Sequence, residues 1–450
     1  MIRSNGMASG PSSEALARDT ATMTSRWIAN PGLVFGSGVA VLLAAGALMF
    51  SRPVLALLAA PLILSLARGW QKRPHSPARV TVTTQFAAAT TLEALHYRTA
   101  IETPPDADFV SVRILARSTW SSRFVVSAAT ARNLVGSFRI IHSGPQEILR
   151  IDYALISADG AFETLPVAGP RSRRVVSPRT TPLRRLPLPF RMLGLAGGHN
   201  SVRPGDGGEF RDISQFAPGD RLRRIDWKVT ARRAQAPGEL YVRRSFATAD
   251  ATVLIVVDSR DNVGDLVTQW GSNAALLEDP TSLDFAREAA SSIASAYIKN
   301  GDRVGFQDLA GKNRIIAPGG GLHQLHRLLP AIARAEPVGA PRRRLRAPSI
   351  PAGAMVYVIS TFLDEEATRM AELWRASGHR VVAIDVLPPA RTRELRREER
   401  AALRIVAMER FDRIDSLRAV GVEVVDWQSG DGASPESQLS VTSRPARRPR

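Results

Sequence analysis

The stretch ATVLIVVD, residues 251–258, decides the fold class of the C-terminal half of this protein. Residues 251–257 are apolar or β-branched without interruption, and an aspartate follows them. Such a run lacks the alternation of polar and apolar residues that marks a half-buried strand, and it is typical of a strand buried on both faces of a parallel sheet. We therefore predict a central parallel strand that ends at Asp258.

Strand-like and helix-like segments alternate after this central strand. We expect strands at residues 303–307, 355–360, 380–386 and 422–425, and helices at residues 281–298, 322–335, 365–376 and within 391–420. This alternation predicts a parallel sheet flanked by helices, so that residues 251–430 form an α/β domain. Ligands of such folds gather at the carboxyl ends of the strands, where Asp258 and Ser360 are expected.

A basic block precedes this domain. Residues 166–250 carry 17 basic and 7 acidic residues and are expected to form an irregular connector. Within it lies the segment GEFRDISQFAPGDRLRRIDWKVTAR, residues 208–232. Its Ala-Pro-Gly-Asp sequence, residues 217–220, predicts a tight turn because proline fixes φ at the second position and glycine permits the third.

Two interpretations of this block remain open. In the first, Asp220 and Asp226 clamp Arg223 and Arg224 in an ion-paired clasp that joins the block to the next domain. In the second, the block is an arginine-rich docking surface for an acidic protein partner. Nucleic-acid binding is less favoured because interleaved aromatic residues for base stacking are absent. The residues that we expect to carry an interaction are Arg211, Asp220, Arg223, Arg224, Asp226, Trp227, Lys228 and Arg232.

The block resembles the signature of the family called domain of unknown function 58. Its departures from that signature are Ser214 and Phe216, which stand where the family has an Arg-x-Tyr element. The resemblance implies a membrane hairpin, a β-rich segment and an α/β domain. It also implies a non-enzymatic protein that works with a MoxR-type AAA+ ATPase in protein-complex maturation or cell-envelope processes. The matching residues are Glu209, Phe210, Pro218, Gly219, Asp220, Arg224, Ile225, Trp227, Lys228, Ala231, Arg232, Leu240 and Val242.

The α/β domain is similar to a von Willebrand factor type A domain with a Rossmann-like parallel sheet. Many such domains bind Mg²⁺ or Ca²⁺ through Asp-x-Ser-x-Ser after the first strand, because hard cations prefer oxygen ligands. Here Arg260 and Asn262 replace the two serines. We therefore expect a degenerate site in which Arg260 pairs with Asp258 or Asp261. If a metal binds, Asp258, Asp261 and Asn262 are its candidate ligands.

The N-terminal region contains two apolar runs, residues 33–50 and 54–67. At a rise of about 1.5 Å per residue, the first spans about 27 Å, close to the thickness of the hydrocarbon core. We expect a two-pass transmembrane hairpin over residues 27–70. Basic residues flank the pair, which predicts that both termini lie in the cytoplasm. A cleaved signal peptide and a buried soluble hairpin are the alternatives. Residues 1–26 and 431–450 are expected to be disordered.

Between the hairpin and the basic block, residues 76–165 alternate polar and apolar side chains. Val110, Val112 and Ile114 are one example. The pattern indicates about six half-buried strands, which predicts a small β-sandwich. No cluster of catalytic side chains is found in this segment.

The formal net charge of the whole chain is +18, yet the excess lies in the membrane flanks, the basic block and short basic runs. A nucleic-acid-binding protein usually carries its basic stripe on a folded domain, so this distribution argues against that class. The chain has no cysteine, which excludes disulfides and thiol catalysis. No enzyme motif is found. The leading hypothesis is the membrane-anchored interaction protein; the alternatives are a metal-dependent ligand-binding or adhesion module that faces outward, and a cell-envelope hydrolase.

Overall fold

A computed structural model describes residues 18–86, 94–116, 120–190, 192, 197–270, 279–310, 315–337, 348–393, 395–428 and 434–443. The chain divides into two compact units. Unit 1 contains residues 1–141 and 145–176, and unit 2 contains residues 142–144 and 177–450. The basic loop within residues 338–347 lies outside the described residues.

Unit 1 contains two antiparallel sheets, as the alternating pattern predicts. The first sheet has the strand order β1 (Arg18–Ser25), β3 (Ala78–Phe86), β4 (Ala94–Glu102) and β7 (Leu134–Arg139). The second has the order β2 (Trp27–Ala29), β9 (Phe162–Thr164), β8 (Gly144–Ser157), β5 (Phe109–Ala116) and β6 (Trp120–Ser127), with β10 (Arg171–Val176) paired to β8. A short helix, α3 (Ala128–Ala131), and a 3₁₀ turn, η1 (Ala158–Gly160), complete the unit.

The inward-facing side chains of both sheets form one apolar core. Val80, Ile101, Val112 and Leu155 are fully buried within it. Period-two burial in β5 and β8 places alternate residues in this core, which is why the segment folds as a sandwich.

The prediction that residues 1–26 are disordered is wrong for the part that the structure describes. Residues Arg18–Ser25 form β1, all eight residues of which pair with β3. Thr20 and Thr22 contribute side-chain hydrogen bonds to Thr83 and Thr81, so threonines that look like an unpatterned linker are edge-strand residues. Residues 1–17 lie outside the described residues.

Two helices, α1 (Pro31–Met49) and α2 (Pro53–Gln71), form a helical hairpin. Each has proline in its first turn, and Asn30 caps α1 by accepting a hydrogen bond from the amide of Gly32 at 2.8 Å. Their large apolar side chains are exposed; Phe35 and Leu64 are both 76% exposed. Each helix spans about 29 Å at 1.5 Å per residue. Length and composition are therefore compatible with a membrane anchor.

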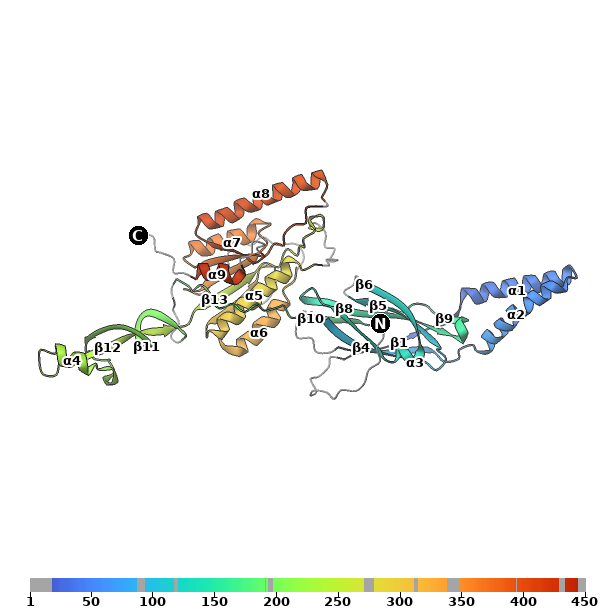
Figure 1. The fold of residues 1–450 in the computed structure, drawn as a ribbon, viewed down its shortest axis with the longest axis horizontal. Coiled ribbons are helices and arrows are strands. Elements are labelled where there is room, and N and C mark those ends of the chain that lie inside the picture. The colour runs from blue at the N-terminus through green and yellow to red at the C-terminus, as the bar shows by residue number, and fades with distance from the viewer. Residues whose placement is uncertain are drawn as a thin grey trace. The chain divides into compact units, whose positions relative to one another are not determined.

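Unit 2 contains a six-stranded sheet with the order β15-β14-β13-β16-β17-β18. All neighbours are parallel except the edge strand β15. The predicted central strand is β13, and the alternation of strands and helices produces the α/β architecture seen in Figure 1. The strands are β13 (Thr252–Val257), β14 (Arg303–Asp308), β15 (Ile316–Gly319), β16 (Met355–Ser360), β17 (Val381–Asp385) and β18 (Glu423–Asp426).

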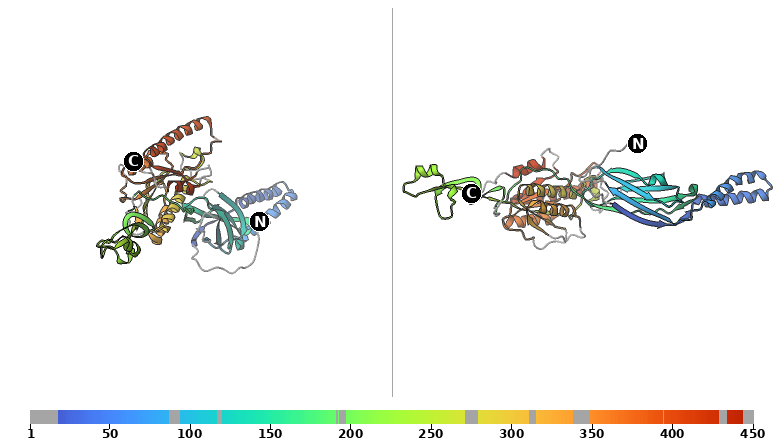
Figure 2. Two further views of the ribbon diagram at one scale, coloured as in Figure 1. Left: turned by 60° about the vertical axis from the view of Figure 1, so that its left-hand side comes forward. Right: turned by 90° about the horizontal axis from the view of Figure 1, so that it is seen from below.

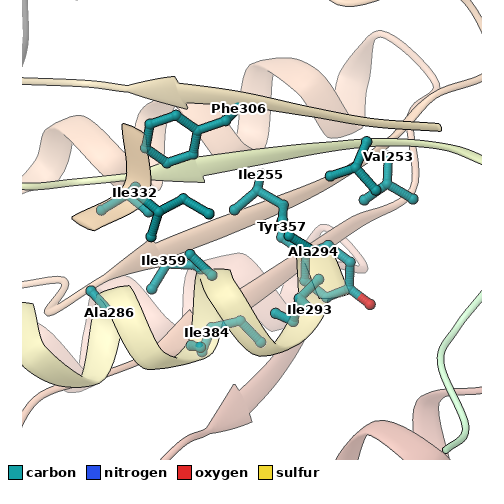
Figure 3. Close-up of a cluster of buried hydrophobic side chains, with 14 of the residues drawn as sticks. Val253, Ile255, Ala286, Ile293, Ala294, Phe306, Ile332, Tyr357, Ile359 and Ile384 are labelled. Atoms are coloured by element: carbon teal, nitrogen blue, oxygen red, sulfur yellow. The ribbon is translucent and has the colours of Figure 1, made fainter. Parts of the chain in front are cut away.

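Helices cover both faces of this sheet. On one face, Val253, Ile255 and Tyr357 pack against α5 (Figure 3). On the other face, Leu254 and Val256 share a core with residues of α7 and α8. Adjacent residues of β13 thus point into opposite cores, which explains why the strand is apolar throughout. The helices of this layered unit are α5 (Ser282–Lys299), α6 (Gly321–Ala333), α7 (Glu365–Ala376), α8 (Arg397–Ala419) and α9 (Pro435–Thr442), with a 3₁₀ turn η3 (Val267–Gln269).

Two segments expected to be irregular belong to the fold of unit 2. Residues 177–190 carry no regular element, yet the Tyr297 hydroxyl donates to the carbonyl of Pro187 and Arg380 donates to that of Leu188.

The prediction of a disordered tail over residues 431–450 is wrong for α9, because Leu439 is fully buried in the core that also contains Trp427. The charge-poor sequence of α9 is too short for its periodicity to be recognised.

The rest of the basic connector forms a two-stranded hairpin. Its strands are β11 (His199–Gln215) and β12 (Tyr241–Ala249), which pair antiparallel with several irregularities in register. A 3₁₀ turn η2 (Leu222–Arg224) and a short helix α4 (Trp227–Arg233) lie at the turn end of the hairpin (Figure 2). Residues 199–249 of the connector therefore form an ordered hairpin, and not an irregular link.

Candidate functional site

The first candidate site lies where the chain leaves the two central strands of unit 2. β13 and β16 are parallel neighbours, and the amide of Asp258 donates to the carbonyl of Ile359 at 2.8 Å. β14 lies on the other side of β13 from β16. The chain after β13 therefore crosses to one side of the sheet, and the later strands are added on the other side. Such a switch point in strand order is the usual ligand-binding position of open α/β sheets. We call Asp258, Arg260, Asp261, Ser360, Thr361 and Asp364 the strand-end cluster.

Arg260 occupies the centre of the strand-end cluster. Its Nε and Nη2 atoms each donate to a different carboxylate oxygen of Asp258 at 2.7 Å. Nη2 also donates to Oδ1 of Asp364 at 2.7 Å, and Nη1 lies 2.6 Å from the second oxygen of Asp364. The Arg260 side chain is only 8% exposed. A bidentate guanidinium with two carboxylates is a strong charge-assisted arrangement, since a planar fork matches the carboxylate geometry.

The surroundings hold Arg260 in its charged form. Burial by itself lowers the pKa of Arg260, but the hydrogen bonds and negative charges of Asp258 and Asp364 outweigh it, so the pKa lies above its ordinary value. Asp261 behaves differently. Burial and repulsion by Asp258 raise the pKa of Asp261, although a hydrogen bond from Thr361 at 2.9 Å opposes the shift.

The predicted residues at this edge separate into two groups. Asp258 and Ser360 meet as expected, because the Ser360 hydroxyl donates to Asp258 at 2.9 Å. Asp261 joins them through Thr361. Asn262, predicted as a third metal ligand, is exposed. The expected pairing of Arg260 with Asp258 is present.

Asp364 was missed from the sequence. It caps α7, because its Oδ1 accepts from the amide of Glu366 at 3.0 Å. The signal was available: an aspartate directly before a predicted helix, four residues after the end of a strand, must lie at the same edge as Ser360.

The cluster as it stands does not fit a divalent cation. The two oxygens of Asp258 already accept from Arg260, and its Oδ2 also accepts from Ser360. The positive guanidinium fills the place beside Asp258 where a cation would need to bind, so both charge and space oppose a metal ion.

The second candidate site is the turn end of the β11–β12 hairpin. Residues 217–220 form the predicted turn, in which the amide of Asp220 donates to the carbonyl of Ala217 and Gly219 has a φ of 102°. Asp220 accepts from the amide of Ala217 and from Arg244, both at 2.9 Å. The hydrogen bond from Arg244, followed by that from Ala217, lowers the pKa of the Asp220 carboxyl.

The predicted clasp between this block's aspartates and Arg223 and Arg224 is wrong. Asp220 pairs with Arg244 of β12. Asp226 is the N-cap of α4 and accepts from the amide of Val229 at 3.0 Å. Both carboxylates accept hydrogen bonds from nearby backbone amides, in the turn and at the helix cap. A short polar side chain reaches such amides more readily than it reaches a distant guanidinium.

The remaining basic residues form a surface that we call the hairpin tip. Leu222 and Trp227 are 69% and 67% exposed. In the part of the chain that the structure describes, Arg223, Lys228 and Arg232 are exposed and form no ion pair. Arg211, also predicted as an interaction residue, pairs with its neighbour Asp212 on β11, and Arg224 is only half-buried. The hairpin tip comprises Leu222, Arg223, Arg224, Trp227, Lys228 and Arg232.

Comparison with known proteins places the C-terminal part of the chain. Residues 212–412 match the family model described as "Protein of unknown function DUF58". The chain is also 30% identical over 205 residues to Uncharacterized protein Mb1516 of Mycobacterium bovis and to Uncharacterized protein Rv1480 of Mycobacterium tuberculosis. These alignments cover 43% of this chain and 60% of each relative. No solved structure matches the chain.

The family match begins within β11 and ends within α8, so it includes the hairpin tip and the strand-end cluster. The family model thus matches the same family whose signature was found in the basic block. Residues 212–412 of this chain are therefore similar to the DUF58 family of proteins of unknown function.

Proposed function

We propose that this protein is a membrane-anchored, non-enzymatic interaction protein whose hairpin tip binds an acidic surface of a MoxR-type AAA+ ATPase. The single observation that carries the proposal is the exposure of Trp227 together with Arg223, Lys228 and Arg232, three cations that form no ion pair within the described residues. In this proposal the unit that bears the hairpin is a von Willebrand factor type A-like domain, which its mostly parallel six-stranded sheet supports. In this proposal α1 and α2 are the anchor, and both termini lie in the cytoplasm.

The composition of the hairpin tip supports a protein partner. Arginine and tryptophan are enriched at the energetic centres of protein interfaces, because each combines a large contact area with polar groups. Exposing the apolar side chains of Leu222 in η2 and Trp227 in α4 to water does not stabilise the fold. Their exposure is understandable if a partner covers them, and the surrounding cations favour a partner of negative charge.

The strand-end cluster supports a role that does not depend on a metal. Ligand binding by a metal-dependent adhesion module needs an open coordination position, whereas Arg260 neutralises Asp258 from within the chain. The outward-facing adhesion alternative is therefore disfavoured by charge and space at this edge of the sheet.

Co-purification from detergent extracts tests the proposal. We expect the full chain to retain a MoxR-type ATPase of the same organism at low salt and to release it as salt rises, because exposed charge pairs are screened. Reversing Arg223, Lys228 and Arg232 to aspartate should abolish retention. The matched control reverses Arg98, Arg113 and Arg123, which are exposed strand residues of unit 1, and should retain the ATPase. Equal retention by both triple variants contradicts the proposal.

Topology is tested by cysteine labelling, since the chain has no native cysteine. A membrane-impermeant maleimide applied to intact cells should label an Arg52→Cys variant, which lies in the turn between α1 and α2. It should not label a Ser443→Cys variant until the cells are permeabilised. Labelling of the Ser443→Cys variant in intact cells contradicts a cytoplasmic C-terminus.

A further inference from the structure

α8 carries an apolar surface that the α/β unit does not use. Its inner side holds Ile414 and Leu417, which are buried, and Arg410 and Arg413, which donate to the carbonyls of Thr361 and Leu363. On the other side Ile405, Met408 and Phe411 are 60%, 66% and 62% exposed. Figure 1 shows α8 as a long helix beside α7.

These exposed residues belong to one continuous face. At about 100° per residue, Met408 marks the middle of that face, with Ile405 and Phe411 about 60° to either side. Ile414 and Leu417 lie on the opposite side of the helix, against the sheet. We call the exposed set the outer face of α8; it comprises Arg397, Ala401, Arg404, Ile405, Met408, Phe411, Asp412 and Asp415, all of them exposed.

Charge divides the outer face into two halves about Met408. Arg397 and Arg404 lie towards the N-terminal end, and Asp412 and Asp415 lie towards the C-terminal end. Within the described part of the chain these four side chains form no ion pair. The helix dipole of α8 is complemented by other residues, Glu398 and Glu399 in its first turn and Arg418 in its last turn. The dipole therefore does not explain the order of charges on the outer face.

A second copy of the chain complements this pattern. When two such helices pack antiparallel, the basic half of each lies beside the acidic half of the other, and the two Met408 side chains meet at the centre. A parallel pair would place like charges together, which is unfavourable. An isologous contact of this kind is the usual basis of two-fold symmetric dimers. We propose that the outer face of α8 is a self-association surface on which two copies pair antiparallel about Met408.

The association is expected to be reversible. Stable protein interfaces bury about 1,200–2,000 Å² in total, more than one helix face supplies. The proposal thus predicts a dimer whose population rises with protein concentration, and it is independent of the hairpin tip and its partner.

Single-cysteine crosslinking of the full chain in detergent micelles tests both the contact and its direction. Packed helices lie about 8–10 Å apart, so a Met408→Cys variant should form a disulfide-linked dimer on mild oxidation. In the antiparallel pair two copies of residue 401 are about 21 Å apart at 1.5 Å per residue, so an Ala401→Cys variant should remain unlinked. A Leu322→Cys variant, exposed on α6, is the control for random collision.

Charge reversal provides a second test that a folding defect cannot imitate. Arg397→Asp with Arg404→Asp should shift the mass measured by light scattering towards the monomer, and so should Asp412→Arg with Asp415→Arg. The variant that carries all four changes should dimerise again, because the halves are complementary once more. Failure of the combined variant to recover, a Met408→Cys yield equal to that of Leu322→Cys, or efficient linking of Ala401→Cys would each overturn the antiparallel pairing.

Discussion

Arg223 at the hairpin tip and Arg260 in the strand-end cluster are separated along the chain by α4, β12 and β13, and their surroundings differ completely. Arg260 is almost buried and contacts two carboxylates, whereas Arg223 is exposed and has no ion pair within the described chain. The first charge is neutralised within the fold, so its removal should act on stability. The second is available to another molecule, so its removal should act on binding.

The largest effect expected from this comparison is on Arg260. An Arg260→Ala variant leaves Asp258 and Asp364 without their shared cation, and breaking a buried pair in this way costs about 3–5 kcal/mol. Hydrogen exchange of the amides of β13 and β16 in the full chain should accelerate accordingly. An Arg223→Ala variant is the matched control and should exchange like the unaltered protein; equal protection in both variants contradicts the assigned role of Arg260.

The second largest effect is expected for Asp226, because it caps α4, the helix that carries Trp227. An Asp226→Ala variant removes the cap of α4 and should destabilise that helix by about 1 kcal/mol. Faster exchange of the Val229 amide measures the loss. An Asp226→Ser variant keeps a capping oxygen and should restore most of the protection. Exchange unaffected by the alanine change contradicts the capping role.

Asp261 should show a smaller effect of opposite sign. Because burial and repulsion by Asp258 raise its pKa in the folded state, the ionised form destabilises the fold, and protonation removes that cost as the pH falls through the raised pKa. An Asp261→Asn variant should therefore be more stable than the unaltered protein at neutral pH and equal to it under acid conditions. Urea unfolding at several pH values measures this. A stability difference that does not vary with pH contradicts it.

Trp227 should give the smallest change in stability and a large one in binding. Its side chain is mostly exposed, so a Trp227→Ala variant should alter the free energy of unfolding by no more than about 0.5 kcal/mol. Loss of the acidic partner in co-purification should accompany this. Trp374, which is 3% exposed, provides the contrast: its alanine variant should lose about 3–5 kcal/mol. A strongly destabilised Trp227→Ala variant would show that the tip is part of a core.

The sequence predicted the α/β unit well because its signals are strong. The strand at residues 355–360 and the helix at residues 365–376 have the expected bounds. The edge strand β15 was missed, since Pro318 and Gly319 in a four-residue strand are typical of a turn. β1 was missed because its partner is the distant β3, and no local pattern records that pairing.

At the candidate sites, too, contacts that follow from strand order were predicted, and contacts between residues on paired strands were not. Ser360 and Asp258 were expected together because both lie at the carboxyl ends of buried parallel strands. The clasp of Arg223 and Arg224 was wrong because sequence proximity favoured it, whereas Arg244 reaches Asp220 across the hairpin. Charge in a sequence shows what a block contains, but the pairing of strands determines which charges remain exposed.

The burial of Leu439 in the core also bears on how the chain is made. Apart from residues 142–144, unit 2 begins at residue 177, and its α/β core includes a side chain close to the end of the described residues. During synthesis that core stays incomplete until nearly all of unit 2 has left the ribosome, while the sandwich of unit 1 has all its strands much earlier. A chain that stopped before α9 would expose the apolar surface around Trp427. Such a product would be a ready substrate for cellular proteases.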